Sequence, residues 1–369
     1  MSYQNVLVTG EELFLKRHKY LFTQLSNSFK RIDYLPIGYL YEPKNYRRFR
    51  RLLYCLNHGV SLSNSDGFFK NSQAFIKRSQ KLEKEIQNLD YKPDLVFHLF
   101  SLCCPFWNNY EIPYTMYLDY TMALAQRNYP PFAPFQTDKE FKSWLECENK
   151  SYEQAQHIFT MSNLVKNSLV TDYNISTDKV TVIGASGNFA EPYMGEKAIG
   201  SQQILFNGSD FDRKGGDVVL DAFKMVKKVF PKAKLVVIGK KLTQTIDGVE
   251  NPGDIRSEYT LQNLFLQSDL VVAPARCEPF GVFLVEAMNY GVPCIVSSND
   301  ANGITDFLAD GVDSIIINQP NPEDLAHHII NLFKNCNVLK SISKAAQNKV
   351  RSQLNWNKIS DQVLQVLLA

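Results

Sequence analysis

Short apolar runs alternate with longer amphipathic stretches along most of the chain. Runs without charged residues at their centres, rich in Val, Ile, Leu and Phe, are typical of parallel strands buried on both faces. We expect strands at 5–10, 93–98, 112–121, 157–162, 179–184, 203–207, 234–239, 269–274 and 293–297. Helical spacing of apolar residues predicts helices at 13–25, 68–89, 138–156, 163–173, 217–230 and 324–335. Strands that alternate with helices indicate an α/β fold built on open parallel sheets.

The pattern is interrupted once, near the middle of the chain. Residues 184–188, Gly-Ala-Ser-Gly-Asn, break all periodicity, and a new strand pattern begins at Gln203. Glycine-rich interruptions of this kind mark turns and domain links. A chain of 369 residues is long enough for two domains of ordinary size. We therefore predict an N-terminal domain at 1–186 and a second domain that begins at 187.

Composition narrows the class of protein. Hydrophobic residues make up 44% of the chain and charged residues 21%, as in soluble globular proteins. A net charge of +2 argues against nucleic-acid binding by the surface as a whole. Seven scattered cysteines without a CxxC pair, no signal-like start and no apolar run of membrane-spanning length predict a cytoplasmic protein with reduced thiols.

Two carboxylates stand eight residues apart in the stretch around which the chain is organised. Glu278 and Glu286 are separated by a little over two helical turns, so we expect them to face the same way. The strand at 269–274 comes just before, and Gly281 is expected to open the helix. Free backbone N–H groups at a helix start bind phosphate, and acids beside it can bind sugar or ribose hydroxyls. The alternative is that Glu278 is a helix cap and Glu286 a solvated helix residue.

This stretch resembles the Glu-x7-Glu signature of retaining glycosyltransferases of family 4. The likeness includes the Glu-x-Phe-Gly start at Glu278, the Glu-Ala-Met end at Glu286 and the Gly-x-Pro that follows at Gly291. It implies the GT-B fold, in which two Rossmann-like domains face each other across a cleft. The second domain would end near 350, and residues 351–369 would form a helix that crosses back onto the first.

The resemblance also implies an activity in polysaccharide or glycolipid biosynthesis. A sugar would move from a nucleotide-sugar donor, a UDP- or GDP-sugar, to an acceptor hydroxyl on a glycan, a glycolipid or a small molecule. The anomeric configuration would be retained. The enzyme would need no metal ion and no cofactor besides the nucleotide-sugar co-substrate.

A glycine-rich loop with two adjacent cations follows the strand at 203–207. In the usual family pattern an Arg follows the first glycine and a Lys precedes the second. Here Ser209 takes the Arg position after Gly208, while Lys214 is retained, and we expect Arg213 to replace the missing cation. Fixed charge beside glycines suits a diphosphate. The alternative is an exposed Arg-Lys pair in a turn.

The same loop contains Asp210-Phe211-Asp212, which matches the metal-binding signature of a different glycosyltransferase fold. We expect these two aspartates to act as turn or cap residues instead, because Asp is favoured at such places.

The resemblance assigns a role to each residue of the donor site. Glu278 would bind sugar hydroxyls and steady the oxocarbenium-like state, Glu286 would hold the ribose, and Ile255 would contact the base. The implied catalytic residues are Glu278, Arg213, Lys214 and Asp119. The implied donor-binding residues are Gly10, Gly208, Ser209, Arg213, Lys214, Ile255, Glu278, Phe280, Gly281, Val282 and Glu286.

The first half carries the expected acceptor site. Its first strand ends in a single glycine, Gly10, rather than a GxGxxG fingerprint. His98 ends a predicted strand, and Asp119 stands where the family usually has a His, next to Tyr120. We expect His98, Asp119 and Tyr120 to bind the acceptor. The alternatives are that His98 is a hydrogen-bonded core residue and that Asp119 caps a turn.

The most basic segment is 43–57. Lys44, Arg47, Arg48, Arg50 and Arg51 are interleaved with aromatic and aliphatic residues, and a helix would separate the two kinds. Such helices can lie on anionic membranes, so we expect residues 44–54 to contact the inner face of a membrane. The alternatives are a solvated surface helix and a clamp for an anionic acceptor.

Two other functions remain open. One is a different GT-B activity, such as that of a nucleotide-sugar epimerase or a phosphorylase, although the intact Glu-x7-Glu argues against the epimerase. The other is a non-catalytic binder of sugar nucleotides, since Asp119 and Ser209 stand at unusual places.

Overall fold

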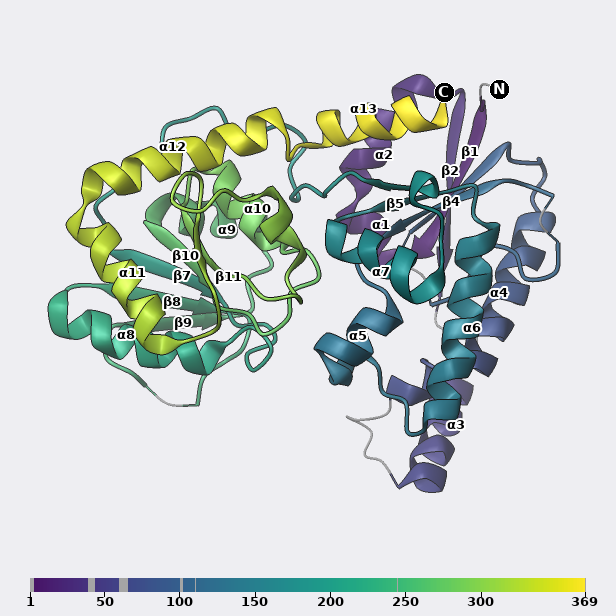
Figure 1. The fold of residues 1–369 in the computed structure, drawn as a ribbon, viewed down its shortest axis with the longest axis horizontal. Coiled ribbons are helices and arrows are strands. Elements are labelled where there is room, and N and C mark those ends of the chain that lie inside the picture. The colour runs from purple at the N-terminus through teal and green to yellow at the C-terminus, as the bar shows by residue number, and fades with distance from the viewer. Residues whose placement is uncertain are drawn as a thin grey trace. The chain divides into compact units, whose positions relative to one another are not determined.

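The computed structural model describes residues 3–38, 44–59, 66–99, 102–109, 111–243 and 245–368 (Figure 1). The chain divides into two compact units. Unit 1 consists of Met1–Ile183 together with Ser360–Ala369, and unit 2 of Gly184–Ile359. The first division, between Ile183 and Gly184, falls at the start of the Gly-rich interruption of the sequence pattern.

Unit 1 is built on a parallel sheet in the order β2-β1-β3-β4-β5-β6. Its strands are β1 Asn5–Glu11, β2 Arg31–Ile37, β3 Leu95–Leu99, β4 Tyr114–Leu118, β5 His157–Thr160 and β6 Val180–Val182. Every residue of β3 and β4 is buried, as the apolar runs predict. The sequence pattern does not predict β2, because this edge strand is mostly exposed and contains Pro36. Proline is tolerated at a sheet edge, where its missing N–H faces no partner strand.

Helices cover both faces of this sheet. They are α1 Glu12–Arg17, α2 Lys19–Leu25, α3 Lys44–His58, α4 Ser72–Gln87, α5 Met122–Asn128, α6 Asp138–Gln154 and α7 Asn163–Tyr173. Apolar residues of α4, α6 and α7 form one core with alternate residues of the strands, among them Leu82, Tyr152 and Leu169. On the other face, the ring of Phe22 in α2 packs edge-on against Phe97 of β3, which stacks on Phe159 of β5.

The single helix predicted at 13–25 is interrupted in the structure. His18 lies between α1 and α2 with a non-helical ψ of 14°. Both its backbone N–H and its ring Nδ1 donate to the carbonyl of Phe14, at 3.0 and 2.8 Å. Side-chain bonds of this kind compete with the helical pattern. The histidine is fully buried, and burial lowers its pKa to about 4, so the ring is neutral near pH 7.

Unit 2 repeats the architecture with the sheet order β12-β11-β10-β7-β8-β9, again all parallel. The strands are β7 Gln203–Asn207, β8 Lys234–Ile238, β9 Val249–Gly253, β10 Leu270–Ala273, β11 Cys294–Ser297 and β12 Ile315–Ile317. The helices are α8 Gly216–Val229, α9 Glu258–Gln267, α10 Val282–Asn289, α11 Pro322–Lys334, α12 Cys336–Ser352 and α13 Trp356–Leu367. Helices α8 and α11 share a core with the strands. On another side, Phe265 of α9 stacks on Tyr290, which follows α10.

Two six-stranded parallel sheets, each flanked by helices, confirm the predicted pair of Rossmann-like units. The final helix belongs to both units, because Trp356–Ile359 group with unit 2 and the residues after Ile359 with unit 1. Among the helices of the described residues, none is long and apolar enough to cross a membrane.

A buried carboxyl group lies in the core of unit 1. Glu148 of α6 is 5% exposed and accepts hydrogen bonds from the Tyr173 hydroxyl and the backbone N–H of Met122. Burial raises its pKa from 4.5 to about 7, although the hydrogen bonds partly oppose this shift. The folded chain therefore binds this proton more tightly than the unfolded chain does.

We predict that Glu148→Gln removes one pH-dependent part of the stability. In the wild type, the free energy of unfolding loses up to about 3 kcal/mol from this group as pH rises from about 4.5 to about 7, and then levels off. A neutral Gln can accept the same two hydrogen bonds and does not titrate. Urea unfolding should show that the free energy of unfolding of the variant, relative to that of the wild type, is higher at pH 8 than at pH 5. An equal stability difference at both pH values would contradict this account.

Candidate functional site

The loops that follow four strands of unit 2 meet at one edge of its sheet. They leave the carboxyl ends of β7, β8, β10 and β11, which are neighbours in a parallel sheet. Open α/β sheets bind their ligands beyond this edge. Every residue that the sequence analysis assigns to the donor site in the second half lies in these loops, in the loop after β9 or in the first turns of α10.

The helix of the Glu-x7-Glu stretch opens at its N-cap Gly281, where the sequence analysis places its start. Gly281 precedes α10 with φ 96°, a conformation that favours glycine, and the helix starts at Val282. Glu278 thus lies in the loop before the helix and Glu286 within the helix, as the expected helix start at Gly281 implies. The backbone N–H of Glu278 donates to Ala301 at 3.1 Å and its carbonyl accepts from Gly303 at 3.1 Å. These bonds fix the loop against the segment that follows β11.

The start of α10 offers unused hydrogen-bond donors. Among the described residues, no acceptor bonds the backbone N–H groups of Phe280, Gly281 and Val282, and no side chain caps the helix. The first N–H groups of a helix have no partner within the helix and carry partial positive charge. This end of α10 can therefore bind an anion.

Both predicted cations of the β7–α8 loop contact Glu278. The Glu278 Oε2 atom lies 3.2 Å from Lys214 Nζ and 3.4 Å from Arg213 NH1. The side chain of Glu278 is 19% exposed and that of Lys214 15%. A Cβ placed on Gly281 would lie 3.5 Å from the Cγ of Glu278. The two cations, the carboxylate and the start of α10 therefore form one cluster, which we call the charged cluster.

Arg213 is the most tightly held member of the charged cluster. Its side chain is 10% exposed and donates from Nε to Asp210 at 2.7 Å and from NH1 to the carbonyl of Cys277 at 2.5 Å. Burial alone would lower the pKa of Arg213, but the Glu278 and Asp210 carboxylates raise it above its usual value. Asp210 thus stabilises the loop through Arg213, in keeping with its expected turn role.

A close backbone approach brings the two loops together. Gly215 precedes α8 with φ 74°, and a Cβ there would lie 2.2 Å from the carbonyl oxygen of Pro274. Only glycine fits this contact. Nearby, Arg276 forms an ion pair with Asp217 at 2.6 Å and donates to the carbonyl of Asp212. The sequence analysis missed Arg276, although its position two residues before Glu278 was a signal.

Glu286 projects from the second turn of α10 toward the start of unit 2. Its Oε1 accepts from the backbone N–H of Asn188 at 2.9 Å, and a Cβ on Gly187 would lie 2.5 Å from its Cγ. The Asn188 side chain donates to Glu258 of α9 at 2.8 Å. The sequence analysis used Gly187 and Asn188 only to place the domain boundary. In the structure, the turn that they form contacts Glu286, the second acid of the Glu-x7-Glu signature.

The other predicted donor residues lie near the same edge. Gly208 and Ser209 follow β7, and the backbone N–H of Ser209 donates to Asn207 at 3.1 Å. A Cβ added to Gly239, which follows β8, would lie 2.6 Å from the backbone nitrogen of Ser209. Ile255 is half-buried in the loop between β9 and α9. Within the described residues, no three His, Cys, Asp or Glu side chains are grouped so that they could hold a metal ion.

In unit 1 the predicted residues lie at the carboxyl edge of its own sheet. Gly10 is the sixth residue of β1, and a Cβ there would lie 2.9 Å from Leu99. Asp119 and Tyr120 are partly exposed in the connection between β4 and α5, and the Tyr120 hydroxyl accepts from Asn128 at 3.1 Å. Near Gly10, a cavity of about 230 Å³ is lined by Glu11 and Arg78 among others. Burial raises the pKa of Glu11.

His98 lies inside this sheet rather than at a surface. It is fully buried, its Nδ1 lies 2.6 Å from the Thr9 hydroxyl, and its Nε2 lies 2.9 Å from the carbonyl of Cys103. Burial lowers its pKa to about 4, so it is neutral at physiological pH. This geometry favours the alternative of a hydrogen-bonded core histidine over contact with an acceptor.

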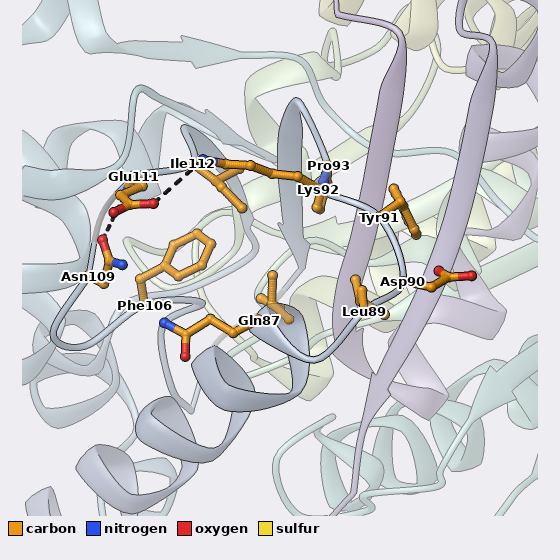
Figure 2. Close-up of a pocket in the computed structure, with 11 residues that line it drawn as sticks. Gln87, Leu89, Asp90, Tyr91, Lys92, Pro93, Phe106, Asn109, Glu111 and Ile112 are labelled. Carbon is orange, nitrogen blue, oxygen red and sulfur yellow. Dashed lines mark hydrogen bonds and ion pairs between the residues drawn. The ribbon is translucent and has the colours of Figure 1, made fainter.

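A larger cavity of unit 1 lies at the opposite edge of the sheet. It measures about 400 Å³ and is lined by residues between α4 and β3 and by residues just before β4. Figure 2 shows Lys92 and Asn109 both contacting Glu111 at its rim. These segments precede the strands, so the cavity lies at their amino ends. Ligands of open α/β sheets bind at the carboxyl ends, and we assign this cavity no role.

Comparison with known proteins bears on the nature of the site. Residues 195–349 match the family described as "Glycosyl transferases group 1". This segment contains the charged cluster and Glu286. An uncharacterized glycosyltransferase of Methanocaldococcus jannaschii is 26% identical over 239 residues, which cover 58% of this chain and 60% of that protein. The similarity thus spans about three fifths of that relative's length.

Solved structures resemble the whole chain. The sucrose-phosphate synthase of Thermosynechococcus elongatus has a TM-score of 0.67 at 14% identity, with 98% of both chains covered. HepE of Anabaena, in complex with UDP and glucose, has a TM-score of 0.62 at 14% identity and full coverage of both chains. These matches confirm the expected GT-B fold.

We predict that Arg213→Ala lowers the free energy of unfolding by about 2–4 kcal/mol. The change leaves the Cys277 carbonyl and part of the Glu278 carboxylate without their buried donor. Arg256 is the matched control, because its pair with Asp254 at 3.1 Å is exposed on both sides. Arg256→Ala should change stability by less than about 0.5 kcal/mol. Equal effects of the two changes in urea unfolding would refute the structural role of Arg213.

Proposed function

We propose that the chain is a retaining glycosyltransferase that needs no metal ion. It moves a sugar from a nucleotide-sugar donor, a UDP- or GDP-sugar, to a hydroxyl of a glycan, a glycolipid or a small molecule. The observation that carries the proposal is the charged cluster, in which Lys214, Arg213 and Glu278 converge beside the open N-terminus of α10. Its support from known proteins is the family match over 195–349 and the GT-B fold.

The cluster suits the diphosphate of such a donor. A leaving nucleoside diphosphate gains negative charge as the bond to the sugar breaks. Lys214 and Arg213 supply two fixed positive charges, and the N–H groups of Phe280, Gly281 and Val282 supply oriented dipoles. Preorganised groups of this kind stabilise charge that develops in the transition state. They also replace the metal ion that other nucleotide-sugar enzymes use, so the reaction needs none.

Glu278 has a second task in this mechanism. Without a donor, its carboxylate balances both cations. Phosphate oxygens would compete for the same cations, and the freed carboxylate can then accept hydrogen bonds from sugar hydroxyls. A negative charge beside the anomeric carbon stabilises an oxocarbenium-like state.

Glu286 and Ile255 would hold the nucleoside. The Glu286 carboxylate is fixed by the Asn188 N–H and would accept hydrogen bonds from ribose hydroxyls. The base would lie against the half-buried Ile255. HepE of Anabaena was solved with UDP and glucose, which favours a uridine nucleotide as the first donor to test. The acceptor would bind unit 1 through Asp119 and Tyr120.

We predict that a donor nucleotide raises the melting temperature of the wild type and not that of Lys214→Ala. UDP-, GDP- and ADP-sugars are screened by thermal shift, where a ligand at 100 times its Kd adds about 2.7 kcal/mol of stability. Lys224→Ala serves as the control, since Lys224 is exposed on α8 and forms an exposed ion pair with Asp221. Equal shifts of the melting temperature in the wild type, Lys214→Ala and Lys224→Ala would show that Lys214 does not bind the donor. No shift with any nucleotide sugar would reject the proposed donor class.

We predict that Glu278→Ala and Lys214→Ala leave folded proteins whose turnover is about 10²–10³ times lower. Loss of one preorganised contact costs about 3–4 kcal/mol of barrier. Turnover is followed as release of the nucleoside diphosphate, and NMR of the product should show the anomeric configuration of the donor, unchanged by EDTA. Glu250→Ala, at an exposed ion pair with Lys234, should keep full turnover.

Three outcomes of that experiment would redirect the proposal. Wild-type turnover in either variant rejects that residue's role. An epimerised sugar, or a sugar phosphate as the product, identifies a different GT-B activity. Donor binding without turnover on any acceptor favours a non-catalytic binder of sugar nucleotides.

A further inference from the structure

The helix α3 of unit 1 turns its apolar side outward. Phe49, Leu52, Leu53 and Leu56 are 58%, 46%, 42% and 70% exposed. Their spacing of three, four and seven residues places them on one face of a helix. We call these four residues the apolar stripe. An ordinary amphipathic surface helix buries such a face against the core.

The opposite side of α3 packs against unit 1 through polar and aromatic residues. The guanidinium carbons of Arg50 and Arg51 lie 5.8 and 5.6 Å from the ring centres of Phe68 and Phe69, respectively. The Tyr54 ring packs edge-on against Phe68 at 5.8 Å. Cys55, next to Tyr54, is only 6% exposed. The orientation of α3 is therefore fixed by contacts that leave the apolar stripe facing solvent.

A basic cavity adjoins the apolar stripe. It measures about 450 Å³ and is lined by Arg50 and Leu53 of α3, by Lys70 and Lys77, and by the first turn of α4. Asn71 caps that turn, since its side chain accepts from the Ala74 N–H at 2.9 Å. Glu140 is the only carboxylate in the lining that the described residues provide. Three cations and a helix N-terminus against one acid make this cavity suited to an anionic group.

We propose that the apolar stripe docks unit 1 on a bilayer of anionic phospholipid, with a lipid phosphate in the adjoining cavity. The inference goes beyond the proposed function and does not rest on it. Helix α3 contains five Lys and Arg residues and no Asp or Glu, so its charge complements an anionic surface. Its 15 residues span about 22 Å, too short to cross a bilayer but long enough to lie in its surface.

The charge of α3 argues against a second copy of the chain as the occupant. A symmetric dimer through the apolar stripe would place the same basic helix opposite itself, and like charges in an interface are unfavourable. On a lipid surface, the apolar stripe can instead contact hydrocarbon, and the flanking arginines can contact phosphate groups. The exposed Arg48 is one such arginine.

The test is co-sedimentation of the full chain with lipid vesicles. We expect wild-type protein to bind vesicles of phosphatidylcholine mixed with phosphatidylglycerol more strongly than vesicles of phosphatidylcholine alone. Binding to the mixed vesicles should weaken as salt is added. Leu52→Glu/Leu56→Glu should lower the partition coefficient roughly a hundredfold or more, since two buried side chains are lost. Arg48→Gln should lower it about fivefold. Val312→Glu/Val338→Glu, at exposed apolar residues of unit 2, is the matched control and should bind as the wild type does.

A spectroscopic readout places the contact on α3. Tryptophan at Phe49→Trp should shift its emission to shorter wavelength with the mixed vesicles and not with phosphatidylcholine alone. Unchanged thermal unfolding of the Leu52→Glu/Leu56→Glu variant shows that its fold is intact. Three results would overturn the proposal: no binding of wild type to the mixed vesicles, equal binding by the double variant, or a dimer through the apolar stripe without vesicle binding. Binding of inorganic phosphate without vesicle binding would overturn it as well.

Discussion

The site in unit 2 depends on the pairing of buried charge between two loops. Arg213 is nearly inaccessible to water, so its charge must be balanced within the chain. Asp210 supplies one partner from its own loop, while Glu278 and the Cys277 carbonyl supply others from the loop after β10. The close contact of Gly215 with Pro274 holds the same two loops together through the backbone. The loops therefore cannot move apart without exposing an unpaired charge.

This pairing explains how two adjacent cations can lie side by side at the proposed diphosphate site. Lys214 and Arg213 would repel each other if they faced only the open start of α10. Glu278 offsets that repulsion at 3.2 and 3.4 Å, and it remains close enough to Gly281 to meet whatever binds there. The carboxylate that balances the cations in the structure is the one that the proposed mechanism releases toward the sugar. The Glu278 side chain thus both stabilises the two loops and takes part in the proposed reaction.

The sequence predicted elements well where one physical signal dominates. The helix predicted at 163–173 has these same bounds in the structure, where the Ser162 side chain caps its start and Asn174 ends it in the left-handed conformation. The edge strands β2 and β9 were missed, because each contains proline and polar residues and neither is a continuous apolar run. The predicted helix at 13–25 failed at His18, since a ring bond to a backbone carbonyl has no signature in the spacing of apolar residues. The site residues of unit 2 were found by motif, but Asn188 and Arg276 were not, because their partners lie 98 and 59 residues away.

The sequence alone determined the α/β class, the two units and the start of α10, and it predicted a phosphate-binding loop at Lys214. These follow from local periods, glycines and charges, which act over a few residues. Tertiary structure decided what those residues contact: Glu278 pairs with both Arg213 and Lys214, His98 is buried in the sheet, and α3 packs Arg50 and Arg51 against aromatic rings while its apolar stripe stays exposed. A helical period fixes which residues share a face. Only the packing of the rest of the chain decides which face is left for water or a partner.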